Sequence, residues 1–135
     1  MMFSSFTKVY FYDADPAGII FYASLFKFAH LAYEDFMRSL NIGRDLFFDK
    51  EVVLPIVHAE GNYLRPIKVG DELIIDVWVS RLMKSSFELS YKIYQVDLHE
   101  SAAAKTVHVC VSKKSFKKTE LPKELHSKLL EHLQK

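Results

Sequence analysis

A long segment that is apolar on almost every side constrains this chain more than any other feature. We predict it to be a helix from about Ser24, a suitable N-cap, to Leu40, with Asn41 and Gly43 ending it. Its apolar positions are Leu25, Phe26, Phe28, Ala29, Leu31, Ala32, Tyr33, Phe36, Met37 and Leu40. A helix that is apolar nearly all round is buried on most of its sides. The rest of the chain therefore has to surround it.

Strands are predicted on both sides of this helix. Alternation of apolar and polar residues is typical of half-buried strands, and Pro55 indicates an edge or bulged strand because proline cannot donate to a sheet ladder. The predicted strands cover 7–12, 52–58 with 59–63, 72–80, 87–96 and 105–113, with a turn over 97–104 and a last amphipathic helix after Leu121-Pro122. We expect an α+β fold, an antiparallel five-stranded sheet wrapped around one long central helix.

Composition narrows the class of protein. The 135 residues are 50% hydrophobic and 14% aromatic, which is enough for the core of one domain over residues 1–135. A net charge of +1 gives no general attraction to nucleic acid. No apolar run approaches a membrane span, the first residues lack a leader pattern, and the single cysteine, Cys110, fits a reducing compartment. We therefore expect a cytoplasmic protein.

Two carboxylates stand in the turn that precedes the long helix, Asp13-Ala-Asp15-Pro16-Ala-Gly18. These are ordinary turn residues, since Pro16 presets φ and Gly18 accepts a positive φ. The first amides of the helix, however, have no partner within it and carry partial positive charge. They could hold an oxyanion while Asp13 or Asp15 attacked an ester or thioester carbon, or prepared a water to do so. The residues alone leave both interpretations open, a plain turn or a hydrolase site without a catalytic histidine or a metal.

This turn and the order of the elements resemble the hot-dog fold acyl-CoA thioesterases of the 4-hydroxybenzoyl-CoA thioesterase family. Residues 12–22, YDADPAGIIFY, are similar to the family's D-x-D-x-x-G followed by two apolar residues and an aromatic pair. The stretches at 54–59, 64–66, 69–73 and 106–111 look like the branch that hydrolyses 1,4-dihydroxy-2-naphthoyl-CoA in phylloquinone or menaquinone synthesis. The resemblance implies an acyl-CoA substrate, no cofactor, and a homo-oligomer, either a dimer or a homotetramer built from dimers.

The resemblance also implies roles for the residues of the turn. Asp15 matches the family's catalytic carboxylate and would be nucleophile or general base, two roles that the sequence does not separate. The backbone N–H of Tyr22, or its neighbour at the helix start, would be the oxyanion donor. Gly18 would allow backbone and ligand to approach closely, and Phe21, the other member of the aromatic pair, is predicted to contact substrate. Asp13 is expected to be structural and to accept turn amides.

Basic side chains are required near the pocket mouth because CoA carries several phosphates. The predicted phosphate contacts are Arg81, Lys84, Ser85 and Ser86, and the lysines between 113 and 118 form a second basic group. His58 is a candidate for a hydrogen bond to an aryl substituent of the substrate. Solvated lysines and a structural histidine are the competing interpretations. His58, His108 and Cys110 have no further ligand at a zinc-like spacing, so no metal site is predicted.

Tyr22 bears on the acyl group, since family members that act on short aliphatic acyl-CoAs often carry a histidine at this position. We therefore predict hydrolysis of an aromatic acyl-CoA of the 1,4-dihydroxy-2-naphthoyl or 4-hydroxybenzoyl type to the free acid and CoA. One alternative is a thioesterase for short aliphatic acyl-CoA or acyl carrier protein. Another is a non-catalytic acyl-CoA binding module, which Asp15 disfavours because a carboxylate beside a buried ligand is costly unless it is used or paired.

Overall fold

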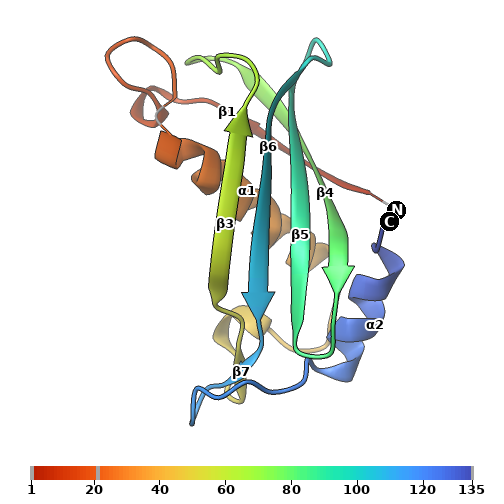
Figure 1. The fold of residues 1–135 in the computed structure, drawn as a ribbon. Coiled ribbons are helices and arrows are strands. Elements are labelled where there is room, and N and C mark those ends of the chain that lie inside the picture. Colours follow the sequence, from red (N-terminus) through yellow and green to blue (C-terminus); the bar gives the residue numbers. More distant parts are fainter. Residues whose placement is uncertain (1, 21, 135) are drawn as a thin grey trace.

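One antiparallel sheet of five strands curls around a long helix, as Figure 1 shows for a computed structural model that describes residues 2–20 and 22–134. The order across the sheet is β1-β4-β5-β6-β3. The strands are β1 (Phe3–Lys8), β3 (Ile56–Tyr63), β4 (Glu72–Leu82), β5 (Ser86–Gln95) and β6 (Glu100–Val109), and the helix is α1 (Tyr22–Ser39). The predicted sheet around a central helix is confirmed.

Shorter elements close the two ends of this unit. They are η1 (Phe11–Asp13), η2 (Leu46–Phe48), the paired strands β2 (Val52–Val53) and β7 (Val111–Ser112), and α2 (Lys123–Glu131). The helix α2 follows Pro122 as predicted and lies beside β4 (Figure 1), where Leu125 and Leu129 are fully buried. In the described ranges no helix is long and apolar enough to cross a membrane.

The core lies between α1 and the inward face of the sheet. Leu25, Phe28, Ala32 and Phe36 of α1 are fully buried, as are alternate residues of β4 and β5. The helix begins at Tyr22, two residues before the predicted start. The predicted N-cap at Ser24 is therefore wrong, because its hydroxyl lies inside the helix and donates to the Asp13 carbonyl at 2.8 Å.

Two predicted boundaries differ from the structure. The first strand ends at Lys8, because the Asp13 carboxylate accepts the Tyr10 N–H at 2.9 Å and draws the chain into η1. The predicted turn over 97–104 is too long, since β6 already begins at Glu100. Ala102 and Ala104 have weak strand propensity, but both are buried on the face that meets α1. This burial outweighs their propensity and places them in the strand.

Small residues on β3 and β6 let α1 approach the sheet closely. A Cβ atom added at Gly61 would lie 2.5 Å from Leu25 Cδ2, well inside contact distance. Gly61 therefore faces the first turns of α1, and so do its alternating neighbours Ala59 and Tyr63. The strand also has the predicted bulge, between Ile56 and His58, and lies at the sheet edge. The start of the helix is thus set by this edge strand.

A buried polar chain crosses the core beneath α1. The His108 ring lies between the rings of Tyr33 and Phe87, with centroids 4.5 and 4.8 Å away. Its Nε2 atom is 2.8 Å from the Thr106 hydroxyl, which is 2.8 Å from the Tyr91 hydroxyl. Burial lowers the pKa of His108 to about 3. The imidazole is consequently neutral in the folded protein at neutral pH.

Gly61→Ala is expected to lower the free energy of unfolding by about 1–3 kcal/mol, since Leu25 must move to admit the new methyl group. The matched control is Gly43→Ala, whose Cβ would meet only Glu124 Oε2 at 4.0 Å. Both variants lose the same freedom of the unfolded chain. Urea unfolding measures the difference, and equal stability of the two variants would contradict the close approach.

Stability should fall with acid because His108 is harder to protonate when folded. With the pKa lowered from 6.5 to about 3, its contribution is complete above pH 6.5 and is lost as the pH falls toward 3. Between pH 7 and pH 5 this amounts to about 2 kcal/mol. His108→Gln, which keeps a polar group beside Thr106, should show a shallower decline in urea unfolding over this range. A slope equal to that of the wild type would contradict the assignment.

Candidate active site

The turn that precedes α1 is a small, well-connected loop. Ala14 pairs with Ile20, the Asp15 N–H donates to the Ile19 carbonyl at 3.0 Å, and the Gly18 N–H donates to the Asp15 carbonyl at 2.9 Å. Gly18 has φ +80°, and no atom lies within 4 Å of a Cβ placed there. Conformation rather than crowding therefore requires glycine at this position. The predicted close approach of a ligand to Gly18 stays a prediction, since the space around this residue is open.

Asp13 fastens this loop to the helix. Its side chain is only 1% exposed, and it accepts from the Tyr10 N–H and from Lys27 Nζ at 2.5 Å. Its carbonyl accepts the Ser24 hydroxyl. Asp13 thus accepts a turn amide as predicted, and its contacts with Ser24 and Lys27 join the loop to α1. The ion pair also leaves the Lys27 ammonium 4.3 Å from the centre of the Tyr12 ring.

Asp15 has a different environment from Asp13. It lies in the exposed part of the loop, and its Oδ1 atom accepts the Ala17 N–H at 2.8 Å. Among the described residues no donor approaches the second carboxylate oxygen. That oxygen is available to a water molecule or to an electrophilic carbon. Of the two acids in the motif, only Asp15 can reach a ligand.

The N-terminus of α1 lies directly after this loop. Tyr22 is the first residue of the helix, and its side chain is 78% exposed. The amides of the first turn have no acceptor within the helix, so they can donate to an anion. Phe21, the other predicted aromatic contact, lies outside the described residues. An exposed carboxylate and free helix amides are therefore the chemical groups that this end of the molecule offers.

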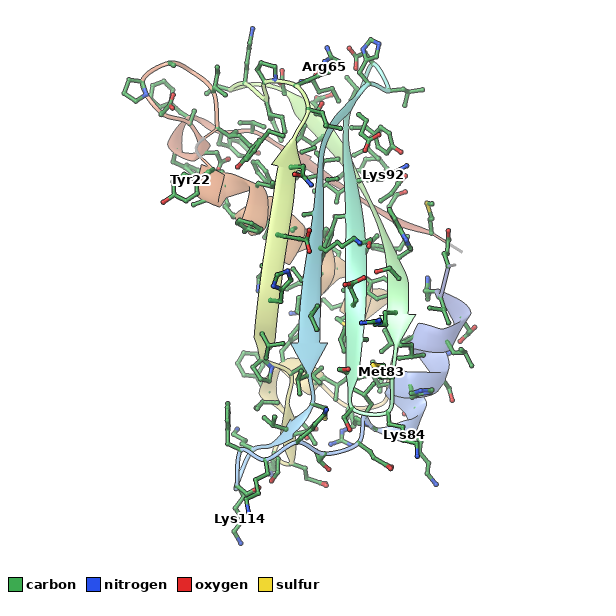
Figure 2. The ribbon with its side chains drawn as sticks, viewed as in Figure 1. Tyr22, Arg65, Met83, Lys84, Lys92 and Lys114 are labelled. Carbon is green, nitrogen blue, oxygen red and sulfur yellow. The ribbon has the colours of Figure 1, made fainter. Side chains whose placement is uncertain are left out.

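Arg81, Lys84, Ser85 and Ser86 lie at the other end of the sheet. Figure 2 shows Tyr22 and Lys84 at opposite ends of the strands. Lys8, which leads into the turn, pairs with Glu72 at the start of β4, whereas Arg81 lies at the far end of this 11-residue strand. At about 3.3 Å per residue, the basic residues near Arg81 are roughly 30 Å from the end of the sheet that carries the turn. One chain alone does not bring the predicted phosphate contacts to Asp15.

His58 lies on the sheet face opposite to α1. It alternates with the helix-facing Gly61, and its Nε2 atom is 3.1 Å from Glu60 Oε1. His108 is buried in the core, and Cys110 Sγ donates to the Glu120 carbonyl at 3.6 Å. The three residues are not gathered. Among residues 2–20 and 22–134 no group of three His, Cys, Asp or Glu side chains could hold a metal ion.

Sequence reasoning missed two features of this end of the molecule. The first is Tyr63, whose hydroxyl donates to the Tyr22 carbonyl at 2.6 Å across 41 residues of chain. Its only sequence signal is its place two residues after Gly61, on the same face of β3. The second is a surface of exposed aromatic rings beside the loop, in which Phe11 and Tyr12 are 86% and 69% exposed. Such rings offer a flat apolar surface to a ligand or a second protein chain.

Comparison with known proteins places these observations in a family. Residues 9–129 match the sequence model of the thioesterase-like superfamily. The 1,4-dihydroxy-2-naphthoyl-CoA hydrolase of Microcystis aeruginosa is 39% identical over 118 residues, 87% of this chain and 85% of that protein. The enzyme of the same name from Nostoc punctiforme is 36% identical over 126 residues, 93% of this chain and 84% of that protein.

Solved structures agree in fold. The crystal structure of a 1,4-dihydroxy-2-naphthoyl-CoA thioesterase from Synechocystis superposes with a TM-score of 0.88 at 26% identity, over 96% of both chains. The predicted hot-dog fold is thereby confirmed.

Proposed function

The chain belongs to the thioesterase-like superfamily, and on that basis we propose that it hydrolyses an aromatic acyl-CoA thioester to the free acid and CoA. The observation that carries the proposal is the exposed Asp15 carboxylate in the loop before the free amides of α1. A carboxylate together with oxyanion donors is an arrangement that can cleave a thioester. We assign catalysis to Asp15 and to the backbone at Tyr22.

Two routes through the reaction use the same groups. As a general base, Asp15 takes a proton from water, and the hydroxide attacks the thioester carbon. As a nucleophile, Asp15 bonds to that carbon, and water later cleaves the resulting anhydride. In both routes the carbonyl oxygen gains charge that the helix amides stabilise, and the carbon–sulfur bond breaks to release the CoA thiolate. Incorporation of labelled oxygen from water into Asp15 in a single turnover would identify Asp15 as the nucleophile rather than the general base.

An aromatic acyl group is supported by two observations. The relatives with the name 1,4-dihydroxy-2-naphthoyl-CoA hydrolase match most of this chain. Phe11 and Tyr12 precede Asp15 and Tyr22 follows it, and their exposed rings could stack on an aryl group. We propose the 1,4-dihydroxy-2-naphthoyl or 4-hydroxybenzoyl type, with Gly18 and Phe21 among the substrate contacts. Cytoplasm is the proposed location, which suits the reduced thiol of Cys110.

We further propose that two copies pair through β3. This strand is eight residues long, lies at the edge of the sheet and exposes apolar side chains such as Ile56 and Val57. An edge of this length is usually paired or covered. A two-fold axis at this edge reverses the partner's strands, so that the partner's Arg81 and Lys84 come to the same end of the joined sheet as Asp15. His58 would then lie at the seam between the copies. A dimer of such dimers is the proposed larger assembly.

Asp15→Asn should lower kcat by about 10²–10⁴-fold, because it removes the base or nucleophile. The measurement is thiol release from 1,4-dihydroxy-2-naphthoyl-CoA, 4-hydroxybenzoyl-CoA and butyryl-CoA. The matched control is Asp45→Asn, since Asp45 also accepts an amide two residues ahead, from Phe47 at 3.0 Å, but lies beyond the other end of α1.

The outcomes separate the candidate functions. An aryl preference that is lost in Asp15→Asn and kept in Asp45→Asn supports the proposal. Faster thiol release from butyryl-CoA than from the aryl esters would contradict an aromatic substrate and support the alternative, a thioesterase for short aliphatic acyl-CoA. Tight binding of all three esters without release would leave a binding module and contradict hydrolysis.

Mixing two impaired variants tests whether the site is shared between copies. One variant carries Asp15→Asn, and the other carries Arg81→Ala with Lys84→Ala, which we expect to raise KM. After exchange of subunits, one site of each mixed dimer joins wild-type Asp15 to the partner's wild-type basic residues. Activity at low substrate should recover to about a quarter of the wild-type value. No recovery, with exchange verified by mass spectrometry, would contradict a shared site.

A further inference from the structure

We propose that Tyr63 is a positioning residue, which holds the first peptide of α1 in the orientation of an oxyanion donor. The inference rests on the proposed thioester hydrolysis. Tyr63 Oη donates to the Tyr22 carbonyl oxygen at 2.6 Å, a contact between the end of the edge strand and the start of the helix. Figure 2 shows Tyr22 at that start. No role for Tyr63 follows from its sequence context alone.

The geometry of a peptide connects this bond to the site. The Tyr22 carbonyl and the Ala23 N–H belong to one planar trans unit, so the two groups point in opposite directions. In a helix the carbonyl points toward the C-terminus and the N–H toward the N-terminus, where the first amides have no helical acceptor. A hydrogen bond that fixes the Tyr22 carbonyl therefore also fixes the direction of the Ala23 N–H. The Ala23 N–H points out of the N-terminal end of α1. Asp15 lies in the loop that leads into this end.

The same hydrogen bond polarises the peptide. Donation to a carbonyl increases the donor strength of the N–H in that unit, an effect of about 10–30% per bond in condensed phases. Tyr63 would thus act on the reaction without touching the substrate. Burial raises the pKa of the Tyr63 hydroxyl above its ordinary value, so the group stays protonated and able to donate at neutral pH.

Tyr63 itself is held by the sheet. It is the last residue of β3, where it pairs with Ala102 of β6. The next two N–H groups, of Leu64 and Arg65, both donate to the Ser101 carbonyl, at 2.9 and 3.1 Å. Two residues earlier Gly61 lies against Leu25, one turn further along α1. The helix start is therefore held against a strand that pairs with β6 along its length.

Tyr63→Phe, which keeps the ring and removes the hydroxyl, tests this role. We expect kcat to fall about tenfold, less than for loss of an oxyanion donor, with KM changed by less than about twofold. The matched control is Tyr94→Phe, because Tyr94 lies on the β5 face turned away from α1 and pairs with Ile74. A second measurement needs no activity. In nitrogen-15 labelled protein, the Ala23 amide proton of Tyr63→Phe should shift upfield and exchange faster with solvent, while Tyr94→Phe leaves it unchanged.

The two measurements separate this inference from the proposed function. A fall in kcat together with the altered Ala23 amide supports the positioning role. Wild-type kcat in Tyr63→Phe, an unchanged Ala23 amide, or an equal loss in Tyr94→Phe would overturn it. If the wild-type protein cleaves no thioester, the hydrolase proposal fails, and the positioning of an oxyanion donor fails with it even where the amide responds. Loss of activity in Asp15→Asn with full activity in Tyr63→Phe would reject only the role of Tyr63.

Discussion

Close packing of α1 against the small residues of β3 and β6 is the contact on which the remaining structure depends. The helix is apolar on most sides, so it must be enclosed, and Gly61, Ala102 and Ala104 let the sheet approach it. This approach fixes where the helix begins relative to the sheet edge. The loop with Asp15 and the free amides of the first turn are then placed by the same packing. The positions of Asp15 and of the first helical amides are therefore a consequence of how the core is filled.

The two acids of the turn illustrate how neighbouring positions acquire different tasks. Asp13 is buried and satisfied by the Tyr10 amide and Lys27, so it stabilises the loop and cannot meet a ligand. Asp15, two residues later, keeps one oxygen without a donor among the described residues. The ion pair of Asp13 is part of what holds the exposed carboxylate in place. A rigid support with one reactive group left open is what preorganised catalysis requires.

Much of this fold could be predicted from periodicity and proline. Alternation gave β4 and β5 to within two residues at each end, and Pro55 and Pro122 identified the bulged edge strand and the last helix. The predicted turn over 97–104 was too long because alanine has weak strand propensity. Ala102 and Ala104 belong to β6 because they are buried against α1. Thr7 to Tyr12 has the composition of a strand, but the strand ends at Lys8 because the Asp13 carboxylate accepts the Tyr10 N–H, and composition does not show that bond. The roles proposed for Asp15 and Tyr22 rest on family resemblance, whereas the contact of Tyr63 could not be predicted because it spans 41 residues.

The strand β3 has three surfaces, each with different surroundings. Ala59, Gly61 and Tyr63 face the helix, His58 and Glu60 face away from it, and the outer backbone edge has no neighbouring strand in the described sheet. Because successive side chains alternate, these surfaces can vary separately in evolution. Substitutions at the even-numbered positions can reshape the outer face while the helix start keeps its place. One strand can therefore change on its outer face and still hold the start of α1 in place.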